Sequence, residues 1–151
     1  TLTAEIINIG MVGEVAGINP DIITSLEKAN FIPVIAPVGV DASGRTYNIN
    51  ADLVAGKVAG ALQAEKLILL TDVEGVQDKS GKLMNMIDIA EVKGLIDDGT
   101  IAGGMVPKVG SALHALGEGS LAERSVIADG RSARALYRAL HEGAGTGFRL
   151  S

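Results

Sequence analysis

Three polar side chains stand within five positions in the stretch YNINADLVAGKVAGAL, residues 47–62, next to a run of small apolar residues. They are Asn48, Asn50 and Asp52. A single Asn or Asp is enough to accept hydrogen bonds from the free backbone N–H groups at the start of a helix. The surplus of side-chain oxygens therefore calls for an explanation beyond helix capping.

A lysine stands where a helix would not favour one. Lys108 falls in the first turn of a predicted helix, residues 106–116, at the positive end of the helix dipole. The preceding loop, which holds Gly104 and Met105, offers unhindered backbone N–H groups of the kind that bind anions at helix starts. The lysine and the loop together predict a phosphate site.

A third polar group follows a predicted strand. In KLILLTDVEGV, residues 66–76, a short apolar run ends at Thr71 and Asp72. Such a run is typical of a strand covered on both faces, and ligands bind at the carboxyl ends of these strands. All three groups lie where a strand or loop meets a helix, and such positions can converge along one edge of an α/β sheet.

Each of these residues also has an ordinary structural explanation, which the patterns leave open. Lys108 could extend into solvent, and Asp52 could be an acid favoured by the helix dipole. Asn48 and Asn50 could form turns. Asp72 could close a loop, and Met105 could pack in the core. The two histidines are isolated and no cysteine is present, so no metal site built from protein side chains is expected.

The composition favours an α/β protein. Hydrophobic residues make up 47% of the 151 residues and aromatic residues only 3%, so Ala, Val, Ile and Leu must fill the core. The net charge of −5, without any basic run, argues against a nucleic-acid partner. No apolar run is long enough to cross a membrane, and together with the lack of cysteine this predicts a cytoplasmic protein.

Apolar periodicity and turn residues predict how the elements alternate. Helices are expected at residues 20–30, 51–63, 88–98, 106–116 and 132–142. Strands are expected in FIPVIAPVGV (31–40), as a buried strand, and in KLILLTDVEGV (66–76), RSVIADGR (124–131) and TGFRL (146–150).

Three motifs in one order, YNINAD, KLILLTDVEGV and GTIAGGMVPKV, resemble the amino acid kinase family, and within it the members that phosphorylate N-acetyl-L-glutamate. The stretches IGMVGEVAGINPDII and FIPVIAPVGV precede them. The resemblance implies a three-layer αβα sandwich with a mainly parallel sheet. It also implies that residues 1–50 end the substrate-binding lobe and that residues 51–151 form the nucleotide-binding lobe.

The family's reaction, as the resemblance implies it, moves the γ-phosphoryl group of ATP, bound with Mg, to the side-chain carboxylate of N-acetyl-L-glutamate. The product, N-acetyl-L-glutamyl 5-phosphate, belongs to arginine biosynthesis. Lys108 would neutralise charge on the moving group, and Asp52 would orient the catalytic lysines. Asn48 would bind the acetylglutamate, and Asn50 would support the loop that carries Asn48. The residues along the nucleotide would be Thr71, Asp72, Gly75, Gly104 and Met105.

The chain also departs from the family pattern. The glycine-rich loop with a further catalytic lysine, and the GGG loop and arginine that hold acetylglutamate, do not occur in it. The N-terminal half of the expected enzyme is missing, so the isolated chain is expected to be inactive and the full-length enzyme to be a homo-oligomer. Two alternatives stay open: a kinase for an N-acylated aminoadipate, and a non-catalytic nucleotide-binding module.

Overall fold

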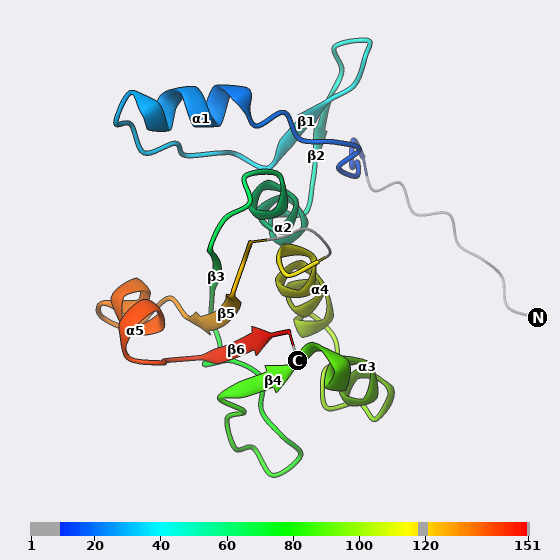
Figure 1. The fold of residues 1–151 in the computed structure, drawn as a ribbon. Helices are drawn as coiled ribbons and strands as arrows, with labels where there is room; N and C mark the ends of the chain where they lie inside the picture. The colour runs from blue at the N-terminus through cyan, green and yellow to red at the C-terminus, as the bar shows by residue number, and fades with distance from the viewer. Residues whose placement is uncertain (1–9, 118–120, 151) are drawn as a thin grey trace, which may run out of the picture.

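The structure is a computed structural model that describes residues 10–117 and 121–150. Helices and strands alternate along most of the chain (Figure 1). In chain order the elements are α1 (Asp21–Lys28), β1 (Val38–Val40), β2 (Thr46–Asn48), α2 (Ala51–Ala61), β3 (Lys66–Thr71), β4 (Met86–Asp88), α3 (Ile89–Asp97), α4 (Met105–Ala115), β5 (Arg124–Asp129), α5 (Ala135–His141) and β6 (Thr146–Arg149). No described helix is long and apolar enough to cross a lipid bilayer.

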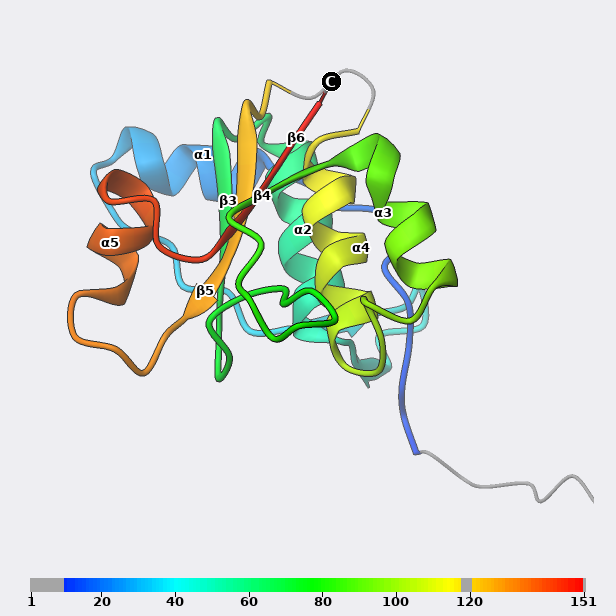
Figure 2. The ribbon, with the colours of Figure 1, turned by 90° about the horizontal axis from the view of Figure 1, so that it is seen from below.

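The larger sheet has the strand order β3-β5-β6-β4. Strand β3 pairs in parallel with β5, from Lys66 opposite Arg124 to Thr71 opposite Asp129, and β4 pairs in parallel with β6. Only the β5–β6 pair among these strands is antiparallel. Helices α2, α3 and α4 cover one face of this sheet and α5 covers the other (Figure 2). The predicted α/β sandwich with a mainly parallel sheet is confirmed.

The hydrophobic core lies between this sheet and helices α2, α3 and α4. Its fully buried members include Ile87, Val109, Ile127 and Phe148. Every residue of this core cluster belongs to the part of the chain after residue 50. Residues 51–150 therefore bury a core that they supply themselves.

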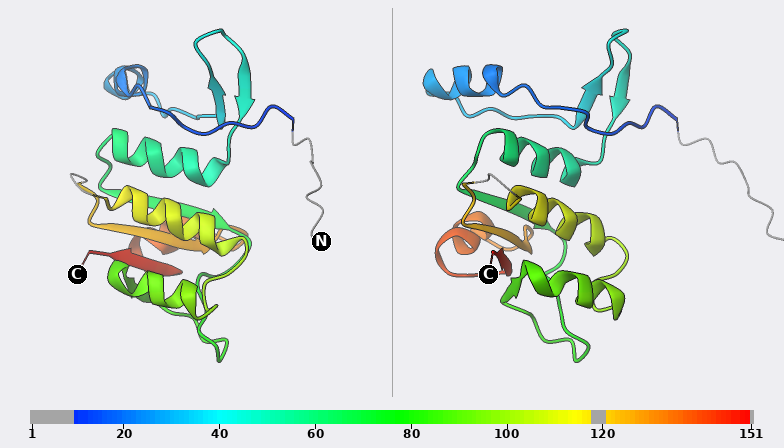
Figure 3. Two further views of the ribbon diagram at one scale, coloured as in Figure 1. Left: turned by 90° about the vertical axis from the view of Figure 1, so that its right-hand side faces the viewer. Right: turned by 45° about the vertical axis from the view of Figure 1, so that its right-hand side comes forward.

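Residues 10–50 are packed differently. Helix α1 and the β1–β2 hairpin extend away from the larger sheet on the far side of α2 (Figures 1 and 3). Among the hydrophobic residues of this part, Ile23 and Ile49 are the buried ones. In contrast, residues Ile32 and Val34 are 91% and 96% exposed.

The prediction of a buried strand across FIPVIAPVGV is wrong for most of its length. Only the last residues form a strand, β1, which pairs with β2 in a two-stranded antiparallel sheet. Residues 31–37 form no strand in the described chain. A strand needs a neighbour for its backbone N–H and C=O groups, and residues 10–117 and 121–150 do not place one beside this segment.

Candidate active site

The predicted site residues at strand ends and helix starts lie along one edge of the larger sheet. The carboxyl ends of β3 and β5 lie at this edge, and α2 and α4 begin there (Figure 2). Thr71, the last residue of β3, pairs with Asp129, the last residue of β5. Sheets of this kind bind ligands at such an edge because the helix N-termini and the strand ends converge there.

Two residues that are 56 positions apart form an ion pair at this edge. The Lys108 ammonium donates to Asp52, with Nζ 3.0 Å from Oδ2 and 3.4 Å from Oδ1. The side chains of Lys108 and Asp52 are only 24% and 21% exposed, so salt screens their attraction less than on an open surface. The alternative in which Lys108 simply extends into solvent is therefore excluded.

The capping of α2 explains one of the three polar residues before it. Asn50 is the N-cap, and its Oδ1 accepts hydrogen bonds from the backbone N–H of Asp52, at 2.9 Å, and of Leu53, at 3.2 Å. This bonding fixes the first turn of α2 and hence the direction in which Asp52 leaves the backbone. Asn50 alone meets the needs of the helix start, so the surplus consists of Asn48 and Asp52.

Asn48 lies at the end of β2, just before that cap. Its backbone is held on both sides, because it pairs with Val38 of β1 and exchanges backbone hydrogen bonds with Met11 and Gly13. The residue itself is exposed. A fixed backbone with an exposed amide suits a residue that binds a polar ligand.

The first turn of α4 is also fixed locally. Pro107 has no backbone N–H to satisfy there, and its carbonyl accepts a hydrogen bond from the Ser111 hydroxyl at 3.0 Å. The exposed Gly104 precedes the helix, and Gly103 has a φ of +55°, a conformation that glycine adopts most readily. Met105 is partly buried against the core, as its ordinary explanation expects.

The residues after β3 divide into two kinds. The Thr71 hydroxyl donates to the Asp72 carboxylate at 3.1 Å, and Asp72 is exposed at the sheet edge. Gly75 is buried instead, with a φ of +148°, and a Cβ atom there would collide with Thr146, 2.9 Å from its backbone nitrogen. Packing against β6 therefore requires glycine at position 75, whether or not a nucleotide lies beside it.

An Asp–Arg pair at the same edge was not predicted from the sequence. Arg131 donates to both oxygens of Asp129, at 2.9 and 3.0 Å. These hydrogen bonds hold the pKa of the Asp129 carboxyl below its usual range. They also raise the pKa of the Arg131 guanidinium, and the negative charge of Asp72 adds to this rise. The signal was present in RSVIADGR, where an acid ends a predicted strand and an arginine follows two positions later.

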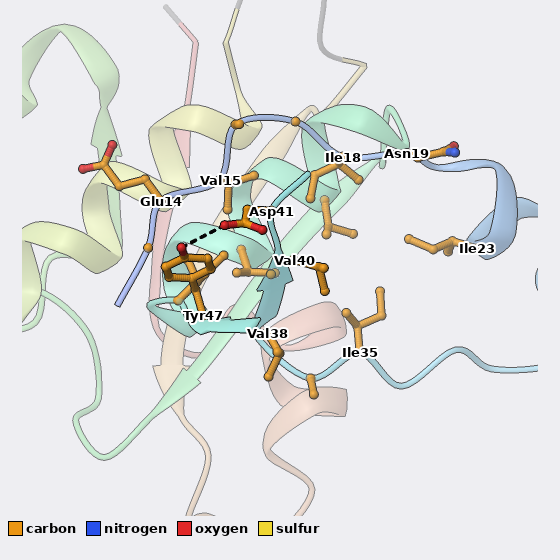
Figure 4. Close-up of a pocket in the computed structure, with 18 of the residues that line it drawn as sticks. Glu14, Val15, Ile18, Asn19, Ile23, Ile35, Val38, Val40, Asp41 and Tyr47 are labelled. Carbon is orange, nitrogen blue, oxygen red and sulfur yellow. Dashed lines mark hydrogen bonds between the residues drawn. The ribbon is translucent and has the colours of Figure 1, made fainter. Parts of the chain in front are cut away.

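An apolar cavity lies away from this edge. It measures about 550 Å³ and lies between α1, the hairpin and α2 (Figure 4). Apolar side chains such as Ile23, Ile35 and Val40 line it, and Tyr47 donates to Asp41 at 2.9 Å on one wall. None of the predicted site residues lines it, and its apolar wall does not suit a phosphate.

Comparison with known proteins points to one family. The model of the amino acid kinase family matches residues 1–129. The acetylglutamate kinase of Geobacter sp. (strain M21) is 53% identical over 98% of this chain and 50% of its own length. That of Oleidesulfovibrio alaskensis is 51% identical over 97% of this chain and 49% of its own length. The chain thus spans about half the length of the curated relatives that it matches.

Solved structures agree with this result. The N-acetylglutamate synthase of Neisseria gonorrhoeae, in complex with coenzyme A and L-arginine, has a TM-score of 0.84 at 26% identity and covers 94% of this chain and 33% of its own. The carbamate kinase of Giardia lamblia bound to AMP-PNP has a TM-score of 0.67 at 27% identity, covering 87% of this chain and 44% of its own.

Proposed function

Because this chain belongs to the amino acid kinase family, we propose that it is part of an acetylglutamate kinase. The reaction transfers the γ-phosphoryl group of ATP to the side-chain carboxylate of N-acetyl-L-glutamate and yields N-acetyl-L-glutamyl 5-phosphate, a step in arginine biosynthesis. The relatives at 51% to 53% identity carry that name, which supports the substrate assignment. In this proposal residues 51–151 form the nucleotide-binding lobe and residues 1–50 end the acceptor-binding lobe.

The Lys108–Asp52 ion pair carries the proposal. Phosphoryl transfer needs little covalent chemistry from the protein, and depends on positioning and on stabilising the charge spread over the moving group. Lys108 lies in the first turn of α4, and the backbone N–H groups of a helix start also attract anions. Asp52 keeps that ammonium in place through charged hydrogen bonds. The pair therefore acts on the phosphoryl group, with Lys108 as the contacting residue.

The nucleotide would lie along the sheet edge. Thr71 ends β3 there and Asp72 follows it, while Gly104 and Met105 lie at the start of α4. No group of three His, Cys, Asp or Glu side chains in the described chain could hold a metal ion. A Mg²⁺ ion bound with ATP would neutralise charge on the phosphates.

The acceptor would approach from the side of the hairpin. Asn48 has an exposed amide at the end of β2, four residues before Asp52, so an acetylglutamate bound by Asn48 would reach the neighbourhood of the ion pair. Asn50 supports this arrangement through the α2 cap.

The proposed enzyme needs more protein than this chain provides. The exposed apolar residues of segment 31–40 and the apolar cavity beside them form a surface that water alone would cover at a cost. We place the N-terminal half of the enzyme on this surface. Its strands would supply the neighbours that segment 31–37 lacks in the described chain.

A kinetic comparison tests this function. The intact protein, expressed from its own gene, is assayed for ADP release with MgATP and either N-acetyl-L-glutamate or an N-acylated aminoadipate. We expect preference for acetylglutamate, and a loss of kcat by about 10²–10³-fold for Lys108→Ala with little change in the KM for ATP. Lys57→Ala is the matched control, because Lys57 is an exposed lysine on α2, and it should behave as wild type.

The other outcomes each select another function. Preference for the aminoadipate would overturn the substrate, and ATP binding without turnover would favour a nucleotide-binding module. Light scattering on the same sample tests whether the intact protein is a homo-oligomer. A Lys108→Ala protein with normal kcat would return Lys108 to a structural role.

A further inference from the structure

Helices α2 and α4 meet in a regular series of contacts that begins at the ion pair. Asp52 faces Lys108, Gly56 faces Ser111 and Gly60 faces His114. Successive contacts are four residues apart on α2 and three apart on α4, so the two helices run in the same direction. This spacing is that of ridges at every fourth residue packed against ridges at every third. Figure 3 shows the two helices side by side.

The helices approach most closely at one of these contacts. A Cβ atom on Gly56 would lie 2.8 Å from the carbonyl oxygen of Ser111, 3.1 Å from its Cα and 3.3 Å from its carbonyl carbon. All three are backbone atoms of α4, which cannot rotate out of the way as a side chain can. At Gly60 the nearest atom to an added Cβ would be the carbonyl oxygen of His114, 4.0 Å away, an ordinary contact.

Ser111 connects this approach to the lysine. It is 1% exposed, and its hydroxyl donates to the carbonyl of Pro107, the residue just before Lys108. A shift of Ser111 away from α2 would carry the first turn of α4 with it, because this bond and the helix join the two. Asp52 lies one turn before Gly56 on the opposing helix, so the same shift would lengthen the ion pair.

We propose that Gly56 is a positioning residue for the phosphoryl-transfer site. Without a side chain, it sets the separation of α2 and α4 at which the Asp52 carboxylate reaches the Lys108 ammonium at 3.0 Å. Gly56 touches neither substrate and acts through the ion pair alone. The effect of Gly56 on catalysis rests on the proposed function, whereas its effect on the ion pair does not depend on that function.

The expected effect follows from the distances. An Ala at position 56 must move α4 by several tenths of an ångström to relieve a carbon–oxygen contact of 2.8 Å. A misplacement of about 1 Å can cost about 10²-fold in rate, so a loss of about tenfold is expected here. ATP binding depends on the sheet edge and the α4 loop more than on the ion pair, and should change little.

The first test compares two glycines of one helix in the intact protein. Gly56→Ala should lower kcat about tenfold, with the KM for ATP within about twofold of wild type. Gly60→Ala gains the same helix propensity on the same helix face, and should leave both parameters within about twofold. Equal effects of the two substitutions, or a change in KM alone, would overturn the proposal.

A second test needs no activity, so it separates this inference from the proposed function. The coupling between Asp52→Asn and Lys108→Met is measured as the non-additivity of their urea unfolding midpoints, in the wild-type background and with Gly56→Ala. The coupling should fall by at least half in the Gly56→Ala background and persist with Gly60→Ala. Unchanged coupling would show that Gly56 does not set the ion pair.

A third variant covers the case in which Gly56→Ala does not fold. Asp52→Glu keeps the charge and leaves Gly56 intact, but places the carboxylate one methylene further from the backbone. If the helix separation suits the length of an aspartate side chain, this variant should fold. Its kcat should fall at least tenfold, and its KM for ATP should stay unchanged. A fully active Asp52→Glu enzyme would overturn the proposal, since the separation would then not matter.

Discussion

Two apolar stretches of this molecule differ in structure, because one forms a strand in the core and the other is exposed and forms none. Residues 66–71, KLILLT, form β3 beside β5 and place Leu67 and Leu69 in the core. Residues 31–37, FIPVIAP, form no strand, and most of their large side chains are exposed. Burying a Val or Ile side chain contributes roughly 1.5–3 kcal/mol, so the second stretch leaves a large stabilising contribution unused.

The two regions of the chain differ in whether they cover their own apolar residues. Residues 51–150 contain both the strands and the helices that cover them, and their core needs no further partner. Residues 10–50 hold apolar residues and a cavity whose covering elements are not among the described residues. The proposed site lies at the junction, with Asn48 in the first region and the ion pair in the second.

The largest effect is expected from testing the chain by itself. The 151-residue chain should show no phosphoryl transfer, because the acceptor and the donor cannot be held in line without the part that covers segment 31–37. ADP release with MgATP and acetylglutamate measures this, corrected for contaminating ATPase. Adding the N-terminal half as a separate chain should restore activity. Turnover that follows the purified 151-residue chain, and vanishes with Lys108→Ala, would contradict the comparison.

Two valines provide a matched test of stability. Val109 is 0% exposed in the core, and Val34 is 96% exposed. In the isolated chain, Val109→Ala should lower the free energy of unfolding by about 2 kcal/mol and Val34→Ala by less than about 0.5 kcal/mol. In the intact protein, Val34→Ala should become destabilising as well. Urea unfolding measures all four values, and a Val34→Ala effect that is equally small in both forms would show that nothing covers residue 34.

A smaller effect concerns self-association of the isolated chain. Its uncovered apolar residues should make it associate, and Val34→Lys should reduce this association because a charge resists desolvation. Leu136→Lys is the control, because Leu136 is an exposed leucine on α5, 52% exposed, in the self-contained region. Light scattering after gel filtration gives the mass of each variant. A stronger effect of Leu136→Lys would place the associating surface on α5.

The smallest expected effect concerns two turns that share one hydrogen-bond pattern. In DASGR, Asp41 accepts hydrogen bonds from the Ser43 hydroxyl and from the backbone of Ser43 and Arg45, and Asp78 does the same in DKSGK. These bonds, led by that of the serine hydroxyl, hold the pKa of each carboxyl below its usual range. Both turns are therefore stabilised at neutral pH, and lose this contribution as the pH falls below about 4.

The Arg45 guanidinium and the Tyr47 hydroxyl each add a further hydrogen bond to Asp41. Tyr47→Phe should therefore raise the pKa of Asp41 and leave that of Asp78 unchanged, as an NMR titration of both carboxyl groups would show. An unaltered Asp41 pKa in Tyr47→Phe would mean that the bond on the cavity wall does not form in solution.

Much of the fold could be predicted from the sequence because the signals are local. The helix starting after Asn50, the one capped by Asp88 and the one containing Pro107 all form within two residues of their predicted bounds. Gly99 has a φ of +79° after α3, as a residue beyond a helix end often does. Hydrogen bonds between residues two to four positions apart decide these features, and such residues can be read together in one short stretch.

Contacts between distant segments were decided by the tertiary structure alone. The sequence placed Asp52 and Lys108 each at a helix start, but the α2–α4 packing brings them together and Gly56 limits its distance. Likewise, Gly75 packs against Thr146, 71 positions further along the chain. Segment 31–37 has strand-like composition, but a strand also needs a neighbour, which no local pattern can supply. Local hydrogen bonding thus selected the elements, whereas packing between elements selected which of their side chains meet.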